Sequence, residues 1–304
     1  MSKLQNVWVL ADQEELGKEI CSGADELGEK VSIVYAGEKD REMEGDTAYY
    51  LGEITETRRW TGYVPAIVRL VKEKKPNLIL IGATKNGRLI AGALAAACET
   101  SVLTDITDIM IEHGVTVKRM VYGGAAYRTE QAEGETLIVC VGAGKFAQKE
   151  LGRKAKVQTV EYVNPGGSIQ CRAVKKKKVL NVNIASAKRV ISVGRGIGAQ
   201  ENLAMIEALA RKLDAAVGCS RPIAEEMRWL PREVYVGVSG VMIKPDLYIA
   251  VGISGQVQHL VGCNQAGILI GINKDKNAPI FRYVDYGIVG DCTKIIPRLL
   301  DKAE

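Results

Sequence analysis

The spacing of apolar residues in the first half of the chain alternates between two periods. Short apolar runs, typical of strands that are covered on both faces, occur at Val7–Ala11, Val31–Ala36, Leu78–Gly82, Glu135–Val141 and Val157–Tyr162. Between them apolar residues recur at helical spacing, and helices are predicted over Glu14–Leu27, Val64–Lys74 and Arg88–Cys98. This alternation predicts a parallel or mixed sheet with helices on its faces, which is an α/β domain.

The C-terminal third repeats the pattern, but its predicted strands open into polar or glycine-rich turns. Arg189–Val193 runs into the turn Gly194–Gly198, and a helix is predicted over Gln200–Leu213. Leu247–Val251 runs into a Gly-Ile-Ser-Gly turn that leads into the first turn of a helix. Further strand ends of this kind are expected at Ala215–Pro222, Tyr235–Gly240 and Gly267–Asn273. The pattern predicts a second α/β domain built on a doubly wound parallel sheet.

A change in composition separates the two patterns. The segment Asn164–Ser168 interrupts the periodicity with Asn-Pro-Gly-Gly-Ser, and Lys175–Lys178 is a run of four lysines. A run of like charge is usually a solvated edge. We therefore expect an N-terminal domain over residues 1–164, a linker and edge segment over 165–186, and a C-terminal domain over 187–304.

Composition narrows the class of protein. The chain has 304 residues, which suits two domains, and its net charge of +5 gives no indication of nucleic-acid binding. Its longest apolar run, Leu89–Cys98, is about half of the ~20 residues that span a bilayer. The seven cysteines include no C-x-x-C pair, which argues against a disulfide framework or an iron–sulfur domain. We expect a protein of the reducing cytoplasm with no membrane span.

The turns after the strands carry the candidate chemistry. A glycine-rich turn such as Gly194–Gly198 lets backbone N–H groups approach a phosphate at the start of a helix. Ser254, Gln258 and His259 form a polar trio that suits a heteroaromatic ring at the carboxyl end of a strand. In the N-terminal half, Gly82–Arg88 has the composition of an anion-binding loop. No acidic residue follows it at the distance of a ribose contact, which favours a structural loop there.

The residues alone leave alternatives open. One is an NAD-dependent dehydrogenase that binds the dinucleotide at the Gly194–Gly198 turn and transfers hydride itself, and another is a non-catalytic nucleotide-binding regulator. Acid–base catalysis has few candidates, because the chain has only two histidines and His113 falls in an expected surface turn. The sequence contains no paired carboxylates, metal-binding cluster or Ser-His-Asp arrangement that would indicate another enzyme class.

Between Lys188 and Asp291 the motifs GRGIG, GCSRP, VGVSG, LYIAVGISGQVQHL and INKDKNAPIFRYVDYGIVGD follow one another. In this order they resemble the FAD-binding domain of the electron-transfer flavoprotein alpha subunit. The Gly-Cys-Ser-Arg-Pro and Gly-Val-Ser-Gly variants resemble the branch associated with nitrogen fixation and with anaerobic acyl-CoA or carnitine reduction. The N-terminal half resembles the family more weakly, through Asn6–Val9, Gly82–Arg88 and Met120–Gly124.

The resemblance implies a set of FAD contacts. They fall at Arg195, Ser220, Arg221, Val236, Gly237, Val238, Ser239, Ser254, Gly255, Gln256, Val257, Gln258, His259, Asn273 and Asp291. It implies that Arg221 lies against the flavin ring and that Asn273 and Asp291 contact the adenosine end. Val238 replaces a usual glutamine and loses its amide, whereas Ser239 replaces a usual threonine and keeps a hydroxyl that can reach flavin N5.

The same resemblance implies an electron carrier rather than an enzyme with its own substrate. Its partner is expected to be an electron-transfer flavoprotein beta subunit that holds AMP or a second FAD, bound mainly through the N-terminal domain. Electrons would pass from dehydrogenases of the acyl-CoA type to a quinone oxidoreductase, a ferredoxin or a reductase. Arg221 and a donor from His259 would stabilise negative charge that develops on the flavin.

Overall fold

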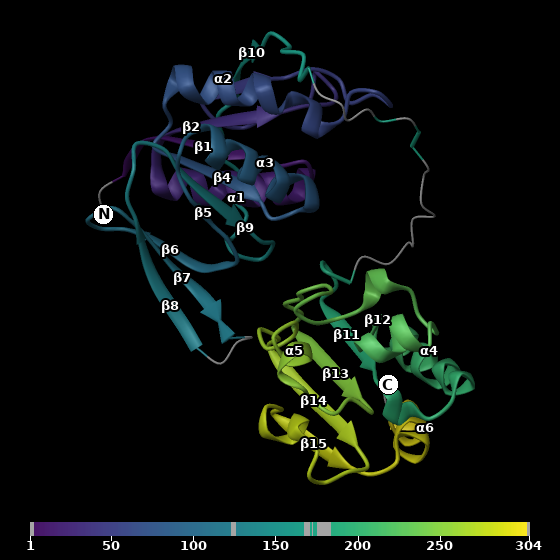
Figure 1. The fold of residues 1–304 in the computed structure, drawn as a ribbon. Helices are drawn as coiled ribbons and strands as arrows, with labels where there is room; N and C mark the ends of the chain where they lie inside the picture. The colour runs from purple at the N-terminus through teal and green to yellow at the C-terminus, as the bar shows by residue number, and fades with distance from the viewer. Residues whose placement is uncertain (1–2, 123–125, 167–170, 172, 175–183, 303–304) are drawn as a thin grey trace. The chain divides into compact units, whose positions relative to one another are not determined.

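The computed structural model of the chain describes residues 3–122, 126–166, 171, 173–174 and 184–302 (Figure 1). The chain divides into two compact units, one with residues 1–121 and 126–176 and the other with residues 177–304 as its main part. The lysine run Lys175–Lys178, and Gly167 and Ser168 of the expected linker, lie outside the described residues.

The N-terminal unit is built on a seven-stranded parallel sheet in the order β10-β3-β2-β1-β4-β9-β5. Its strands are β1 (Leu4–Leu10), β2 (Gly28–Tyr35), β3 (Thr47–Tyr50), β4 (Leu78–Gly82), β5 (Val102–Leu103), β9 (Leu137–Val141) and β10 (Lys156–Thr159). Strand β1 lies between β2 and β4, with Val7 opposite both Val31 and Leu78. The predicted α/β class is confirmed, although β3 and β5 were not predicted and β10 is shorter than expected.

Helices cover both faces of this sheet, so side chains of β1 alternate between two apolar layers. Val7 and Val9 pack in one layer with residues of α1 (Glu14–Leu27). Trp8 and Leu10 pack in the other with residues of α2 (Val64–Lys74) and α3 (Lys85–Ala97). Helix α3 begins three residues earlier than predicted because the Thr84 hydroxyl accepts a hydrogen bond from the backbone N–H of Gly87 and caps the helix.

A three-stranded antiparallel sheet in the same unit was not predicted. It consists of β6 (Ile106–Ile111), β7 (Val115–Val121) and β8 (Ala126–Ala132) in that order. Only one face of β7 is well buried, at Val115 and Val117, and β8 is mostly exposed. Such half-polar strands lack the continuous apolar runs that marked the covered strands. His113 is exposed in the turn between β6 and β7, where the sequence placed it.

The C-terminal unit is built on a second parallel sheet, in the order β12-β11-β13-β14-β15. Its strands are β11 (Arg189–Val193), β12 (Ala216–Cys219), β13 (Leu247–Val251), β14 (Ile268–Asn273) and β15 (Tyr286–Val289). The chain starts in β11, steps to β12 on one side and then returns to build the other side, which is the doubly wound arrangement predicted.

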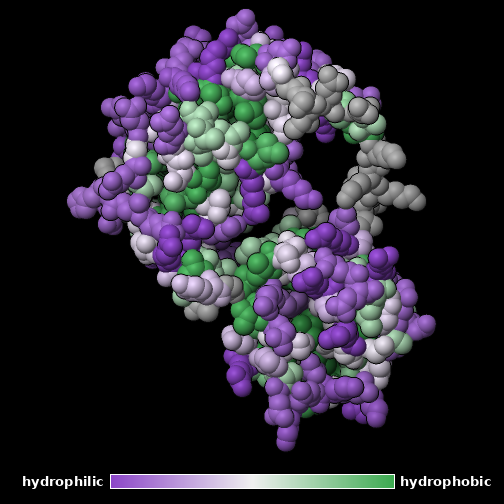
Figure 2. Space-filling view, in the orientation of Figure 1, coloured by the Kyte–Doolittle hydropathy of each residue, from purple (hydrophilic) through white to green (hydrophobic). Residues whose placement is uncertain are grey.

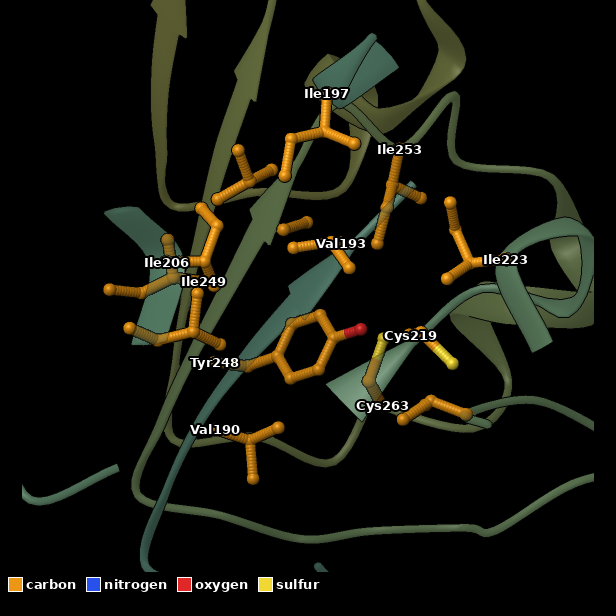
Figure 3. Packing of buried hydrophobic residues seen from close by; sticks show 14 of the residues in the cluster. Val190, Val193, Ile197, Ile206, Cys219, Ile223, Tyr248, Ile249, Ile253 and Cys263 are labelled. Carbon is orange, nitrogen blue, oxygen red and sulfur yellow. The ribbon is translucent and has the colours of Figure 1, made fainter. Parts of the chain in front are cut away.

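Helices of the C-terminal unit are shorter than the sequence indicated. The predicted helix Gln200–Leu213 is a 3₁₀ turn over Gln200–Asn202 followed by α4 (Leu203–Lys212), which packs with α6 (Cys292–Lys302). Helix α5 (Val257–Leu260) is a single turn. Figure 3 shows part of the shared apolar core, with the ring of Tyr248 among Val190, Cys219 and Cys263.

Polar side chains cover most of the visible surface of each unit (Figure 2). No helix among the described residues is long and apolar enough to cross a bilayer. All seven cysteines carry free thiols.

Candidate cofactor-binding site

The strands of the C-terminal sheet end level with one another. Val193 of β11 lies opposite Cys219 of β12 and Val251 of β13, and Val251 lies opposite Ile272 of β14. Because the sheet is parallel, the loops that follow these residues all begin at the same edge. Ligands of open α/β sheets bind at this edge, where the order of strands reverses. In this sheet the reversal falls between β11 and β13.

Glycines let the two loops at the reversal touch through their backbones. Gly194 N donates to Val251 O at 2.8 Å, and Gly196 N donates to Gly252 O at 2.9 Å. A Cβ atom on Gly196 would lie 2.7 Å from Gly252 Cα, so no larger residue fits without a backbone shift. Arg195, between the two glycines, is exposed. The N–H groups of Gly194, Gly196, Ile197 and Gly198 already donate to backbone carbonyls, so the turn is rigid and Arg195 is the cation that it offers to a pyrophosphate.

A small crevice beside this turn brings two predicted residues together. It is lined by Gly196, Gly252, Ile272, Asn273, Lys274, Gly290, Asp291 and Cys292. The Asn273 side chain is fixed by its amide N–H, which donates to Ile253 O at 2.9 Å. Hydrogen bonds from Thr293, from its hydroxyl at 2.8 Å and its N–H at 2.9 Å, lower the pKa of Asp291 and keep it a carboxylate. Acceptors of this kind suit the hydroxyl groups of a ribose.

The loop after β12 places a cation at the edge. Ser220 is buried, whereas Arg221 is exposed and caps a π-helical turn, Pro222–Glu226. The guanidinium pairs through Nε with Glu225 at 2.7 Å, and Glu225 also meets Arg232 at 3.3 Å. The hydrogen bond that Arg221 donates to Glu225 raises the pKa of Arg221, so the guanidinium stays charged. Its terminal nitrogens make no hydrogen bond within the described part of the chain.

The segment Val236–Ser239 is held beside β12 without forming a strand. The sequence indicated a strand end here, but Tyr235 and Val236 form only isolated bridges, to Cys219 and Val241. Its backbone is joined to α5, because Val238 N donates to Gln258 O at 2.8 Å. Gly237 has φ 148° and sits against that same carbonyl, so the approach depends on glycine.

Val238 and Ser239, which the resemblance implies are departures, have different surroundings. The Val238 side chain is half exposed, so it presents an apolar group to solvent. The Ser239 hydroxyl lies 3.0 Å from the Tyr235 hydroxyl. Ser239 is therefore already hydrogen-bonded, and a bond to flavin N5 would have to be shared with Tyr235 or replace it.

The loop after β13 approaches the end of the sheet and then starts α5. Gly255 has φ +82°, and a Cβ there would lie 2.4 Å from Ile280 Cα, so only glycine fits. Ser254 and the three residues Gln256, Val257 and Gln258 are exposed. The loop is fixed by a hydrogen bond from Ile280 N to Ser254 O at 2.9 Å.

His259 differs from its neighbours because it is 7% exposed. Its Nε2 lies 2.7 Å from the hydroxyl of Tyr248, which is fully buried. Burial lowers the pKa of His259 to about 4, and a contact with the Val236 backbone offsets part of that shift, so the imidazole is neutral at pH 7. The buried Nδ1 has no hydrogen bond of good geometry among the described residues. A charged imidazolium is therefore not what this site offers.

Sequence reasoning missed two residues that act on the site through others. Glu225 compensates the charge of Arg221, and its position four residues later on a helical turn was the available signal. Tyr248 is the partner of His259 across 11 residues, and no local spacing indicates such a pair. The other predicted residues are distributed over the loops after β11 to β15, all leaving the same edge.

The N-terminal sheet has a similar turn, Gly82–Arg88, but a carboxylate of the chain already sits against it. Asp12 accepts hydrogen bonds from the Thr84 hydroxyl and the Asn86 amide, each at 2.7 Å. These contacts place a negative charge beside the first turn of α3, where an anion would otherwise bind. The structure thus supports a structural role for this turn. Among the described residues, no group of three or more His, Cys, Asp or Glu could hold a metal ion.

The residues at the C-terminal edge fit a flavin nucleotide. Their combination of glycine turns without room for Cβ atoms, an unpaired buried ring nitrogen and an available guanidinium suits a ligand with a phosphate and a polar ring.

Comparisons with known proteins agree with this assignment. Residues 7–165 match the electron transfer flavoprotein domain, and residues 183–264 match the electron transfer flavoprotein FAD-binding domain. The chain is 38% identical over 309 residues to the "Putative electron transfer flavoprotein subunit YdiR" of Escherichia coli K12, covering 99% of each. It is also 38% identical to the protein FixB of Salmonella typhimurium LT2, covering 98% of each. These matches, which extend over nearly the whole chain, show that it belongs to the electron transfer flavoprotein family as an alpha-type subunit of the FixB branch.

Proposed function

We propose that this chain carries FAD at the carboxyl edge of its C-terminal sheet and passes electrons between redox partners as the alpha half of a heterodimer. The observation that supports this most is the meeting of a glycine-lined phosphate turn, the Arg221 guanidinium and the buried His259 at one sheet edge. That edge lies in the unit that matches the family's FAD-binding domain. We take residues 187–304 as this FAD-binding domain.

Different residues of the site would bind different parts of the cofactor. Arg195 and the Gly194–Gly198 turn would receive the pyrophosphate, and Asn273 and Asp291 would receive the adenosine end. Ser220, Arg221, Ser239 and the loop from Ser254 to His259 would surround the ring. Bound FAD would supply the redox chemistry, whereas the protein fixes its position and the surrounding electric field.

Two groups near the ring would act on it in different ways. Arg221 carries a permanent charge that favours electron density on the flavin, and Glu225 weakens that effect by its opposite charge. The neutral imidazole of His259 can donate a hydrogen bond without adding charge. The field at the ring therefore depends mainly on the arginine–glutamate pair.

The partners follow from family membership. We propose that residues 1–164 bind a beta subunit that holds AMP or a second FAD, and that residues 165–186 link this domain to the FAD domain. Electron donors would be dehydrogenases of the acyl-CoA type, and acceptors a quinone oxidoreductase, a ferredoxin or a reductase, in the cytoplasm. The dehydrogenase alternative at the Gly194–Gly198 turn is not favoured, since both matching family models describe electron transfer flavoproteins.

The test is to purify the chain together with its beta subunit and to identify the bound flavin by chromatography after denaturation. We expect FAD in the complex, and the Asn273→Ala variant should hold it more than tenfold more weakly than wild type. Asn264→Ala is the matched control, because Asn264 is exposed outside the candidate site. FMN alone, or equal FAD affinity in both variants, would refute the proposed adenosine contact, and no flavin at all would refute the function.

A further inference from the structure

Two backbone hydrogen bonds close the Gly194–Gly198 turn around Arg195. Ile197 N donates to Gly194 O and Gly198 N donates to Arg195 O, each at 3.1 Å. They form a single 3₁₀ turn, in which hydrogen-bond geometry is poorer than in an α-helix. The closed shape of the turn, and with it the direction of the Arg195 side chain, therefore depends on peptide units that keep their orientations.

The side chain of Asn202 holds one of these peptide units from the side of α4. Its Nδ2 donates to Ile197 O at 2.8 Å, and the contact is partly buried. Asn202 is the residue before α4, where an asparagine usually caps the helix with its side-chain oxygen. No such cap forms in the described helix, and the side chain is directed back to the turn instead.

The Ile197–Gly198 peptide unit is therefore fixed at both of its polar ends. Its carbonyl accepts from Asn202 and also from Ala199 N at 3.2 Å, and its N–H closes the turn onto Arg195 O. Gly198 has φ +88°, and the conformational freedom of glycine would let this peptide unit rotate if Asn202 released the carbonyl. Rotation would turn the N–H away from Arg195 O and open the turn.

We propose that Asn202 is a positioning residue for FAD binding, which fixes the Ile197–Gly198 peptide unit so that the turn keeps Arg195 directed to the pyrophosphate. The part that concerns FAD rests on the proposed function, whereas the fixed peptide unit is a property of the protein itself. Because the amide of Asn202 is bound to Ile197 O, Asn202 acts on the cofactor only through the turn. Its removal should therefore matter only while Arg195 is present to be positioned.

A double-mutant cycle in the purified complex with the beta subunit tests this coupling, with FAD affinities measured by titrating the flavin-free complex. Asn202→Leu keeps nearly the shape of asparagine but cannot donate, and it should bind FAD about tenfold more weakly than wild type, the upper range for one hydrogen bond. Arg195→Ala should also weaken binding, and the variant with both changes should bind no more weakly than Arg195→Ala alone. Gln200→Met, which removes an exposed amide from the neighbouring 3₁₀ turn, should bind as wild type does.

Two results of this cycle would overturn the proposal. One is equal FAD affinity in wild type and Asn202→Leu. The other is a pair of effects that multiply in the variant with both changes, because an asparagine that only stabilises the fold would act whether or not Arg195 is present.

Hydrogen exchange of the Asn202 side-chain amide tests the fixed peptide unit in wild type, so the proposal can be decided even if Asn202→Leu fails to fold. In the complex with ¹⁵N-labelled asparagine, NMR should show slower exchange for Asn202 than for the exposed Asn264, both with and without FAD. Equal exchange rates would overturn the proposal. A wild-type complex without any flavin would instead refute the proposed function, and the exchange comparison would still decide whether Asn202 holds the turn.

Discussion

The two parallel sheets of this chain place similar turns at their carboxyl edges, yet only one set of turns suits a cofactor. In the N-terminal unit, the turn before α3 is occupied by the Asp12 carboxylate, which Thr84 and Asn86 hold. In the C-terminal unit, the corresponding turn after β11 carries the exposed Arg195 and glycines that touch Gly252. The difference teaches that the α/β architecture provides the edge, and the side chains of its loops determine whether a ligand can use it.

The largest expected effect is a pH dependence of the unfolding free energy, which we attribute to His259 and not to His113. His259 has its pKa lowered from 6.5 to about 4 by burial, so between these values the unfolded chain binds a proton that the folded chain does not. Acidification through this window should therefore lower the unfolding free energy of the C-terminal unit, by about 3 kcal/mol in all. Urea unfolding followed by tryptophan fluorescence, at neutral pH and at a pH between 4 and 6.5, measures this; Trp229 reports on the C-terminal unit, and Trp8 and Trp60 report on the N-terminal unit.

Replacing each histidine sharpens that comparison. His259→Gln should remove most of the pH dependence of the C-terminal unit, whereas His113→Gln, on the exposed turn of the N-terminal unit, should leave it intact. A pH dependence that survives in His259→Gln would show that another group is responsible.

The next effect concerns glycines in the two units. Gly196→Ala places a Cβ 2.7 Å from Gly252 Cα, and the required backbone shift should cost about 1–3 kcal/mol and reduce flavin retention. Gly92→Ala, in α3 of the N-terminal unit, meets nothing within 4 Å and should stabilise its helix by about 0.5–1 kcal/mol. Thermal unfolding and flavin content measure both. Full flavin retention in Gly196→Ala would contradict the close-contact argument.

A third prediction compares two arginines that follow parallel strands. Arg221→Ala should lower the flavin's first one-electron potential, because it removes a cation beside charge that develops on the ring; we expect up to a tenfold change in that equilibrium, about 59 mV. Arg88→Ala, which breaks the exposed pair of Arg88 with Asp105, should not change the potential. Arg232→Ala is the stricter control, since Arg232 shares Glu225 with Arg221. Spectroelectrochemical titration gives the potentials, and equal values in all variants would leave Arg221 a structural residue.

The smallest effect is expected at the carboxylate that fills the N-terminal turn. Asp12→Ala removes the acceptor of the Thr84 and Asn86 hydrogen bonds and should destabilise the N-terminal unit by about 1 kcal/mol, while flavin content stays unchanged. Denaturation and flavin counting on the same sample measure this. Loss of flavin in Asp12→Ala would show that the two units are not chemically separate.

Covered strands and long amphipathic helices were predictable from the sequence. A strand that is buried on both faces has a continuous apolar run, and a helix that is buried on one face repeats apolar residues at helical spacing. Helix Glu14–Leu27 and strands Leu78–Gly82, Arg189–Val193 and Leu247–Val251 have the predicted bounds. The antiparallel sheet β6–β7–β8 was not predictable in this way, since most of β8 faces solvent and its polar residues need no period. Tyr235 and Val236 looked like a strand because they are buried, yet they bridge the sheet only at single positions.

In the candidate site, too, some features were predictable from the sequence and others were not. Residues in the turns after strands were identifiable, since the position of a turn fixes the edge at which its residues lie. The partner of a side chain is different, because it is set by packing between segments distant in sequence. The Tyr248 hydroxyl against His259, the Ser239 hydroxyl against Tyr235 and the Asp12 carboxylate against Thr84 all depend on such packing. Hence the charge state of His259 became clear only with its burial.

The level ends of the C-terminal strands have a consequence for how such a protein can change through evolution. Val193, Cys219 and Val251 complete the paired parts of β11, β12 and β13 before the cofactor loops that follow these strands begin. Substitutions and insertions beyond these residues leave the hydrogen bonds of the sheet intact. Evolution can therefore change the residues around a cofactor, and with them its redox potential, while the fold stays the same. The half-exposed Val238 is at a position where a substitution of this kind leaves the hydrogen bonds of the sheet intact.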